Sequence, residues 1–322
     1  MIGKWLLACL MASHFSLALA DDVTQQDPWV LLDKAAHAAR DLSYKGIFMY
    51  QSGTNSRSIE ITHMNAGQGE YSRIVMLDGQ PQELLSQGSD IVIFSPRNEK
   101  VVIEKRRGKN LFPALLPVNL ELVKASYKAR ITGQERVAGR EGFLVLLEPR
   151  DDYRYGFRLL TDKEFGLLLK ATTLNQQSEV IEQIAFNQLN LLNMSDMEWF
   201  KPQVDPGKPY VMEEEVPAGL AESPQDWSLE QLPPGYRQID HIKRMVPGKK
   251  AAVNQLIFSD GLSSVSLFIE PLVKGTRPKV GQTTVGPTNF YANVNHGHQI
   301  VVVGEVPQAT VAQIANSVHF KQ

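Results

Sequence analysis

The chain has 322 residues, of which 43% are hydrophobic and 21% charged, and its formal net charge is −2 at pH 7. This near-neutral charge argues against a nucleic-acid-binding protein, because such proteins usually present a strongly basic surface. The length exceeds what one hydrophobic core usually organises, so we expect two domains.

The first twenty residues have the pattern of a secretory signal peptide. Lys4 provides a basic start, an apolar stretch follows, and Ala18-Leu19-Ala20 precedes the acidic Asp21. We predict cleavage after Ala20 and export from the cytoplasm. The alternative is a membrane anchor, but the apolar run is shorter than the roughly 20 residues that a spanning helix needs.

The single cysteine, Cys9, lies inside this segment. Leu6-Leu7-Ala8-Cys9 resembles a lipid-attachment box, but few apolar residues precede it, whereas a signal's apolar core normally has about 7 to 15. We therefore expect Cys9 to be removed with the signal. The remaining chain then has no thiol for disulfides, thiolate metal sites or a cysteine nucleophile.

The expected mature chain begins with an amphipathic helix. Asp27 is a suitable N-cap and Pro28 fits the first helical position. Apolar residues recur behind them at helical spacing. These residues are Trp29, Leu32, Ala35, Ala36, Ala39 and Leu42.

From residue 46 the pattern changes to short alternating or β-branched segments separated by turn residues. The predicted strands cover residues 46–50, 59–62, 71–77, 83–87, 90–95, 100–104, 142–148, 153–160, 167–174 and 180–189. Few helices and no β-α-β alternation indicate a mainly β fold of α+β class. We predict that residues 21–192 form a large antiparallel sheet or half-open barrel.

An apolar, proline-containing segment at residues 111–117 interrupts these strands, directly after four cations within residues 105–109. The cations fit a solvated hairpin tip, but they also suit the phosphates of a lipid head group, with the apolar segment meeting acyl chains. Alternation leaves open which strand face points inward. The candidate lipid-binding residues are Phe48, Tyr50, Ile91, Ile93, Arg106, Arg107, Phe112, Leu115 and Leu116.

Residues 193–226 are rich in proline and acidic residues, and we expect a linker there. Residues 227–322 are predicted as a smaller α+β domain with strands near 237–245, 252–258, 265–270 and 300–304, closed by a helix after Pro307.

The charge differs between the two predicted domains. Residues 21–225 contain 23 Lys and Arg against 29 Asp and Glu, a net −6, whereas residues 226–322 contain 9 against 6, a net +3. A basic surface on the second domain suits an acidic peptide or protein, although solvated basic faces are common. The candidate partner-binding residues are Lys243, Arg244, Lys249 and Lys250.

The sequence contains no Gly-x-Ser-x-Gly elbow, no phosphate-binding loop ending in Lys-Ser/Thr and no His-Glu-x-x-His motif. We therefore expect that the protein is not an enzyme and binds no cofactor. The alternative is a hydrolase whose catalytic groups come from scattered carboxylates and histidines. His296-Gly297-His298 has the spacing of two metal ligands. Its Asn-His-Gly context favours a polar hairpin turn instead.

Two parts of the sequence carry a family resemblance. The sharpest stretch is Pro149 to Phe157, continuing through Asp162 and Gly166-Leu167, and the second block comprises Trp227, Leu232-Pro233-Pro234-Gly235, Ser259-Asp260-Gly261 and Val303 to Pro307. In these residues the chain resembles the RseB/MucB family of periplasmic regulators, and the resemblance covers nearly the whole expected mature chain.

The resemblance implies a first domain like the lipoprotein carriers and a smaller α+β second domain. It also implies that the protein binds the periplasmic part of a single-pass anti-sigma factor, shields it from regulated proteolysis, and releases it when a lipid or lipopolysaccharide signal is sensed. A homo-oligomer is compatible with this role. The alternative is a periplasmic carrier of lipid or lipoprotein.

Overall fold

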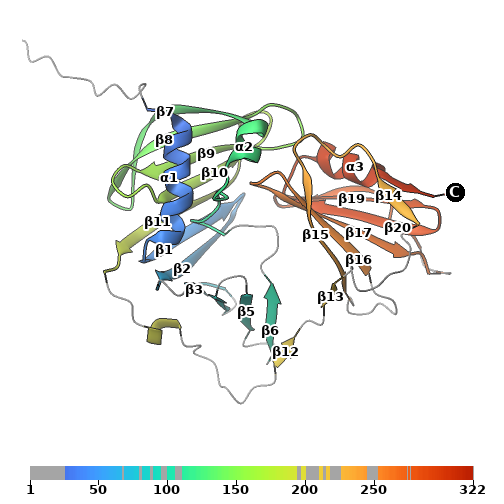
Figure 1. Ribbon diagram of the computed structural model, residues 1–322, viewed down its shortest axis with the longest axis horizontal. Coiled ribbons are helices and arrows are strands. Elements are labelled where there is room, and N and C mark those ends of the chain that lie inside the picture. The colour runs from blue at the N-terminus through green and yellow to red at the C-terminus, as the bar shows by residue number, and fades with distance from the viewer. Residues whose placement is uncertain are drawn as a thin grey trace, which may run out of the picture.

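The computed structural model describes residues 26–66, 69–79, 82–87, 90–95, 100–105, 111–193, 197–200, 210–212, 215–217, 226–244, 253–273, 275 and 277–321. The expected cleavage site at Ala20 therefore lies outside the described residues. Most of the described chain lies in two large β-sheets with a few short helices (Figure 1). The prediction of a mainly β fold is confirmed.

Helix α1 (Pro28–Asp41) opens the described chain and lies across the first sheet (Figure 1). The carboxylate of Asp27 accepts a hydrogen bond of 2.9 Å from the backbone N–H of Trp29, as expected of an N-cap. Its buried face consists of Leu32, Ala35, Ala36, Ala38 and Ala39. The four alanines of this face let the helix pack close to the strands.

Twelve strands of the described chain form the first sheet, in the order β12-β6-β5-β4-β3-β2-β1-β11-β10-β9-β8-β7. Neighbouring strands are antiparallel except for β12 and β6. The strands are β1 (Tyr44–Ser52), β2 (Asn55–Asn65), β3 (Glu70–Met76), β4 (Glu83–Gln87), β5 (Asp90–Ser95), β6 (Lys100–Lys105), β7 (Tyr127–Val137), β8 (Arg140–Pro149), β9 (Gly156–Asp162), β10 (Leu168–Leu174), β11 (Val180–Leu191) and β12 (Tyr210–Met212).

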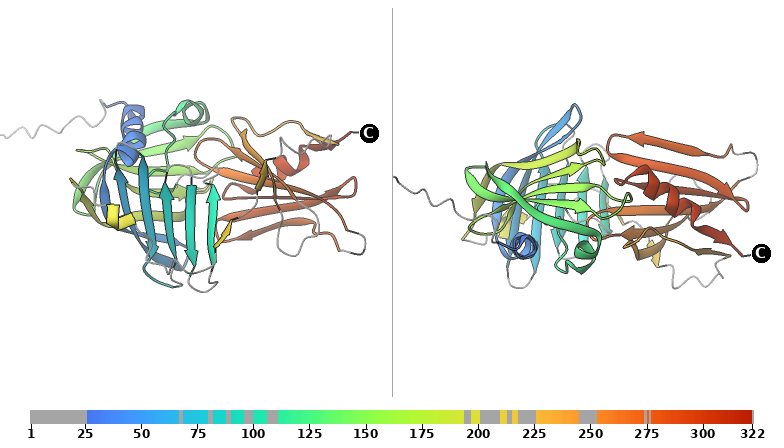
Figure 2. Two further views of the ribbon diagram at one scale, coloured as in Figure 1. Left: turned by 60° about the horizontal axis from the view of Figure 1, so that its bottom comes forward. Right: turned by 90° about the horizontal axis from the view of Figure 1, so that it is seen from above.

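The first sheet curves strongly but does not close, since β7 and β12 end it at separate edges (Figure 2). The predicted half-open barrel is therefore confirmed. Strand β7 was missed from the sequence. Charged and polar residues such as Lys128, Arg130 and Arg136 alternate along it, so only its inward positions carry an apolar signal. It turns into β8 through Ala138 and Gly139, both at positive φ.

The second sheet contains seven described strands, in the order β13-β15-β16-β17-β20-β19-β18, and the short strands β14 and β21 pair separately. Strands β18 and β19 were not predicted. The elements are β13 (Glu215–Pro217), β14 (Trp227–Leu229), β15 (Arg237–Arg244), β16 (Val253–Ser259), β17 (Ser264–Pro271), β18 (Gly281–Val285), β19 (Thr288–Asn295), β20 (His298–Gly304), α3 (Gln308–Asn316) and β21 (Val318–Phe320).

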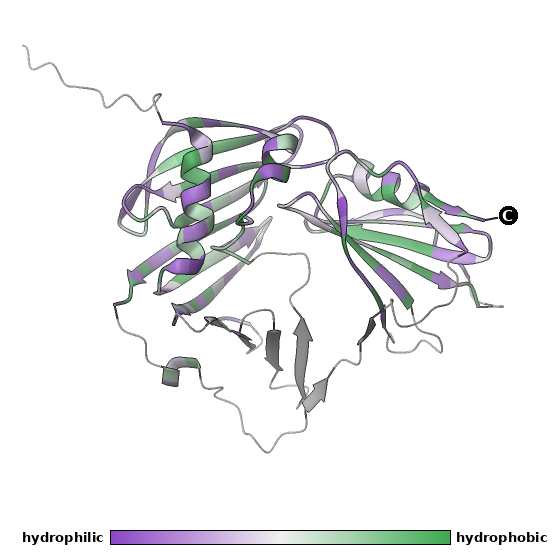
Figure 3. Ribbon diagram, in the orientation of Figure 1, coloured by the Kyte–Doolittle hydropathy of each residue, from purple (hydrophilic) through white to green (hydrophobic). Residues whose placement is uncertain are grey.

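Hydrophobic and hydrophilic residues alternate along helix α1 and along strands of both large sheets (Figure 3). Helix α3 begins directly after Pro307 and buries Val311, Ile314 and Ala315, as expected from its spacing. The segment expected to act as a linker contributes one short strand to each sheet, because β12 pairs with β6 and β13 with β15. No helix in the described ranges has the length and apolarity to cross a bilayer.

Candidate ligand site and the junction beside it

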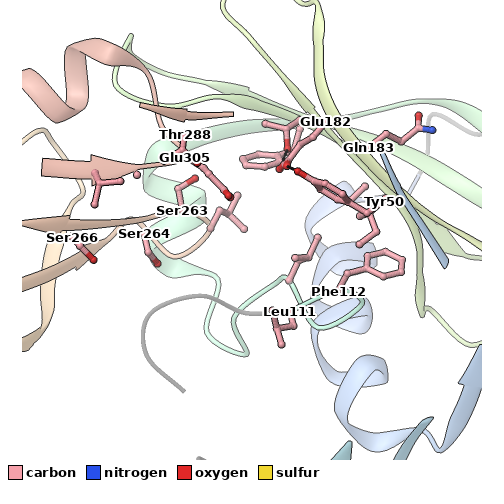
Figure 4. Close-up of a pocket in the computed structure, with 18 residues that line it drawn as sticks. Tyr50, Leu111, Phe112, Glu182, Gln183, Ser263, Ser264, Ser266, Thr288 and Glu305 are labelled. Atoms are coloured by element: carbon pink, nitrogen blue, oxygen red, sulfur yellow. Dashed lines mark hydrogen bonds between the residues drawn. The ribbon is translucent and has the colours of Figure 1, made fainter. Parts of the chain in front are cut away.

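An apolar pocket of about 500 Å³ lies between the two sheets (Figure 4). We call residues 26–193 the first half; they contain all of the first sheet except β12. We call residues 226–321 the second half; they contain all of the second sheet except β13. The first half lines the pocket chiefly through Tyr50, Leu111, Phe112, Leu115, Phe157 and Ile184. The second half contributes Leu262, Ser263, Ser264, Thr288, Val303 and Glu305.

Two strands of the first sheet place a tyrosine and a carboxylate together on this wall. Tyr50 on β1 donates a 2.8 Å hydrogen bond to Glu182 on β11, a neighbouring strand (Figure 4). Burial and the nearby Glu182 carboxylate raise the pKa of Tyr50 to about 12. The phenol therefore stays protonated at neutral pH and acts as a hydrogen-bond donor rather than as a base.

The structure brings three of the predicted lipid-binding residues to the pocket, namely Tyr50, Phe112 and Leu115. Phe48 and Leu116 are instead buried in the core of the first half, at 3% and 1% exposure. The Phe48 ring lies 5.2 Å from the Phe112 ring, so Phe48 supports the pocket wall from behind.

The remaining predicted lipid-binding residues cannot be placed in the pocket. Ile91 and Ile93 lie on β5, where the structure describes the backbone pairing and not the side chains. Arg106 and Arg107 lie outside the described residues.

Sequence reasoning missed the entire second wall of the pocket. Leu262 and Ser263 belong to the turn between β16 and β17, and Glu305 follows β20. The Ser259-Asp260-Gly261 motif at this turn was the available signal. Nothing in the local pattern indicated that this turn faces the first half.

A buried ionic cluster joins the two halves beside the pocket. Arg154, only 1% exposed, contacts Asp151 at 2.6 Å in its own half and Asp260 at 3.1 Å in the other half. Its guanidinium also donates to the carbonyl of Pro234. Asp260 is fully buried, so its negative charge depends on Arg154 for compensation.

Two tyrosines complete this cluster, which we call the junction: Arg154, Asp260, Tyr127 and Tyr236. The Tyr127 hydroxyl donates to Asp260 over 3.2 Å, and both rings lie within 6 Å of the Arg154 guanidinium carbon. Burial, followed by the Asp260 carboxylate, raises the pKa of Tyr127 and of Tyr236 well above the usual value. Both hydroxyls are therefore donors throughout the physiological pH range.

The backbone at the junction is equally close-packed. Gly235 has φ +78°, and a Cβ there would lie 2.6 Å from the Ser126 hydroxyl. Glycine avoids both the left-handed strain and this clash. The carbonyl of Tyr153 accepts hydrogen bonds from Thr310 and Tyr236, at 2.6 and 3.1 Å. Segment 149–157 is thus fastened to the second half by backbone and side chains.

The motifs that carry the family resemblance therefore converge in space. Residues 149–157, 232–235 and 259–261 are far apart in the chain, yet all three supply groups to the junction. These three motifs thus meet at one place between the halves.

The predicted basic face is described only in part. Lys243 is half-buried on β15 opposite Val216, and the backbone of Arg244 pairs with Glu215. Lys249 and Lys250 lie outside the described residues. His296 and Gly297 form the two-residue turn between β19 and β20, both at positive φ, so the predicted hairpin is confirmed.

A pocket with this lining, held between two fastened sheets, is typical of a binding protein. The chain belongs to the MucB/RseB family: the MucB/RseB N-terminal domain model matches residues 27–204 and the MucB/RseB C-terminal domain model matches residues 221–319. The resemblance found in the sequence is thereby confirmed.

Similar proteins agree with this assignment. The sigma factor AlgU regulatory protein MucB of Pseudomonas aeruginosa is 30% identical over 89% of each chain. The sigma-E factor regulatory protein RseB of Haemophilus influenzae is 24% identical over 95% of this chain and 94% of its own. The Pseudomonas aeruginosa MucA/MucB complex structure matches with a TM-score of 0.74 and 28% identity, covering 92% of this chain and all of that chain.

Proposed function

We propose that this protein is a periplasmic regulator of an extracytoplasmic sigma factor. In this role it binds the periplasmic part of a single-pass inner-membrane anti-sigma factor, shields that part from proteolysis, and releases it when a lipid or lipopolysaccharide-type ligand binds. The supporting observation is the similarity, over 92% of the chain, to a MucB solved in complex with MucA(peri). The molecule acts by binding alone in this proposal.

The pocket suits the lipid part of this proposal. Its walls carry Phe112 and Leu115 from one half and Leu262 and Val303 from the other, so an acyl chain would contact both halves. A ligand that contacts both halves stabilises the relative orientation of the halves that it fits best. If the anti-sigma segment binds another orientation more tightly, each ligand then lowers the affinity of the protein for the other.

The anti-sigma segment is expected to contact the basic face of the second half. Purified protein spanning residues 21–322 should bind the periplasmic region of the anti-sigma factor of the same organism and slow its cleavage by the protease that degrades it. Reversing the charges of Lys243, Arg244, Lys249 and Lys250 to Glu should weaken binding by about tenfold or more, measured by calorimetry.

A matched control reverses four cations of the first half, Lys124, Lys128, Arg130 and Arg136, which are exposed. The Kd of this control for the anti-sigma segment should lie within about twofold of that of the unaltered protein, because exposed charges away from the contact surface contribute little to affinity. Equal weakening by both quadruple variants would remove the basic face from the proposal. No binding by the unaltered protein would contradict the function itself.

The pocket also supports a second candidate, a carrier of lipid or lipoprotein. A carrier should move its cargo from donor to acceptor vesicles in proportion to its own concentration. Transfer of a labelled lipid without binding of any anti-sigma segment would favour the carrier over the regulator.

A further inference from the structure

The two large sheets of the described residues end in four edge strands, and three of them are protected against pairing with another chain. Strand β7 carries Lys128, Arg130 and Arg136 and has a register shift near Gly133. Strands β12 and β13 have three residues each. Charges, bulges and short length are the usual devices that keep an edge from accepting a further strand.

Strand β18 has none of these devices. Its sequence, Gly-Gln-Thr-Thr-Val, contains no charge and no proline, and it pairs with β19 in unbroken register. All five residues are exposed. Val280 and Val285, at its two ends, are 72% and 66% exposed. The strand therefore offers an uncharged edge without a bulge.

The register determines which backbone groups face outward. The turn at Gly286-Pro287 makes Val285 and Thr288 the closing pair of the hairpin, and Gly286 has the positive φ that such turns require. Alternate residues of an antiparallel strand direct their N–H and C=O away from the partner. On β18 these residues are Gln282 and Thr284.

The edge is also held rigid. The Thr284 hydroxyl donates to the side chain of Asn289 over 2.6 Å, and Gln308 of α3 donates to that hydroxyl. Asn289, 4% exposed, in turn donates to the carbonyl of Val306 and to the hydroxyl of Tyr155. A strand fixed in this way loses little freedom when a partner pairs with it.

We propose that β18 accepts an extended segment of the anti-sigma factor as an added strand. This proposal rests on the function proposed above and adds a second contact surface to the basic face, since β15 and β18 lie near opposite edges of the second sheet. Backbone hydrogen bonds from an added strand provide affinity, and flanking side chains provide specificity. Arg277 and Lys279 are exposed directly before β18. The segment should therefore be uncharged where it faces residues 281–285 and carry carboxylates at the end beside these two cations.

The turn of the β18–β19 hairpin also lies next to the pocket, since Thr288 lines it. Asn289, the following residue, reaches the first half at Tyr155. A segment added along β18 would thus run toward the mouth of the pocket. A ligand bound in the pocket would therefore lie close enough to the segment to change the affinity of the protein for it.

The test uses the protein spanning residues 21–322 and the recombinant periplasmic region of the anti-sigma factor. Gln282→Pro removes an outward N–H and should weaken binding by at least about tenfold, whereas the matched Gln282→Ala keeps that N–H and should stay within about twofold. Arg277→Glu combined with Lys279→Glu should weaken binding and reduce its salt dependence. In the unaltered protein, hydrogen exchange at Gln282 and Thr284 should slow on binding, which tests the edge without any substitution.

The outcomes separate this proposal from the function on which it rests. If the unaltered protein does not bind, the proposed function fails. If it binds, but Gln282→Pro binds equally well and exchange on β18 is unchanged, the edge proposal is overturned while the function stands. If Gln282→Pro abolishes only self-association in sedimentation, the edge pairs with a second copy and the proposal is likewise overturned.

Discussion

Replacing Arg154 with methionine is expected to lower the free energy of unfolding by about 3 to 5 kcal/mol. The substitution leaves Asp260 fully buried without its cationic partner and removes the ion pair to Asp151. An uncompensated carboxylate in a low-dielectric interior is the most costly consequence of breaking such a pair. Urea unfolding followed by circular dichroism measures the change.

The matched control for Arg154→Met is Arg130→Met. Arg130 pairs with Glu148 over 3.2 Å, but both side chains are about half exposed, at 57% and 45%. The control should therefore cost no more than about 1 kcal/mol. If Arg154→Met costs as little as the control, the junction does not stabilise the fold.

A double-mutant cycle with Asp260→Asn isolates the contact between the halves. In the unaltered protein the Asp260 carboxylate accepts hydrogen bonds from the backbone N–H groups of Leu262 and Ser263, at 3.0 and 2.8 Å. Asparagine keeps an oxygen that can accept both bonds. The two substitutions should be non-additive by about 1 kcal/mol or more, since the groups are in direct contact. Additive effects would mean that Arg154 and Asp260 do not act as a pair.

Phe112→Ala should also lower the free energy of unfolding, by about 3 to 5 kcal/mol. Phe112 is 4% exposed, and its ring lies 5.0 Å from that of Phe186 and 5.2 Å from that of Phe48. Truncation leaves a cavity in this aromatic cluster. Because Phe112 also lines the pocket, the variant should bind an apolar fluorescent probe several-fold more weakly.

Phe186→Ala is the matched control for the pocket effect. Phe186 belongs to the same cluster and is 2% exposed, but it does not line the pocket. It should destabilise the fold to a similar extent while the affinity for the probe changes little. Equal loss of probe affinity in both variants would show that probe binding follows general stability and not the pocket wall.

Local pattern was sufficient for much of the fold. Asp27 and Pro28 marked the start of α1, and most strands were visible because an apolar face alternates with a polar one. Strand β18 was missed because all five of its residues are exposed, so no apolar alternation exists to detect. A strand of this kind is defined by its partner β19 and not by its own sequence.

The candidate site could be predicted only in part because it depends on contacts between distant residues. Tyr50, Phe112 and Leu115 were found as apolar or aromatic residues of the first half. Arg154 stands beside Asp151 and Asp152 in the sequence and has the pattern of a solvated charged turn, yet its partner Asp260 lies 106 residues away. Local periodicity carries no information about such a pair.

We propose that an anti-sigma segment and a lipid-type ligand both bind this chain and weaken each other's binding. The most direct measurement is calorimetric titration of residues 21–322 with the periplasmic segment at increasing concentrations of lipopolysaccharide. We predict that the Kd of the segment rises and then levels off, and that the segment raises the Kd of lipopolysaccharide by the same factor. A segment Kd that does not change at saturating lipopolysaccharide would contradict the claim.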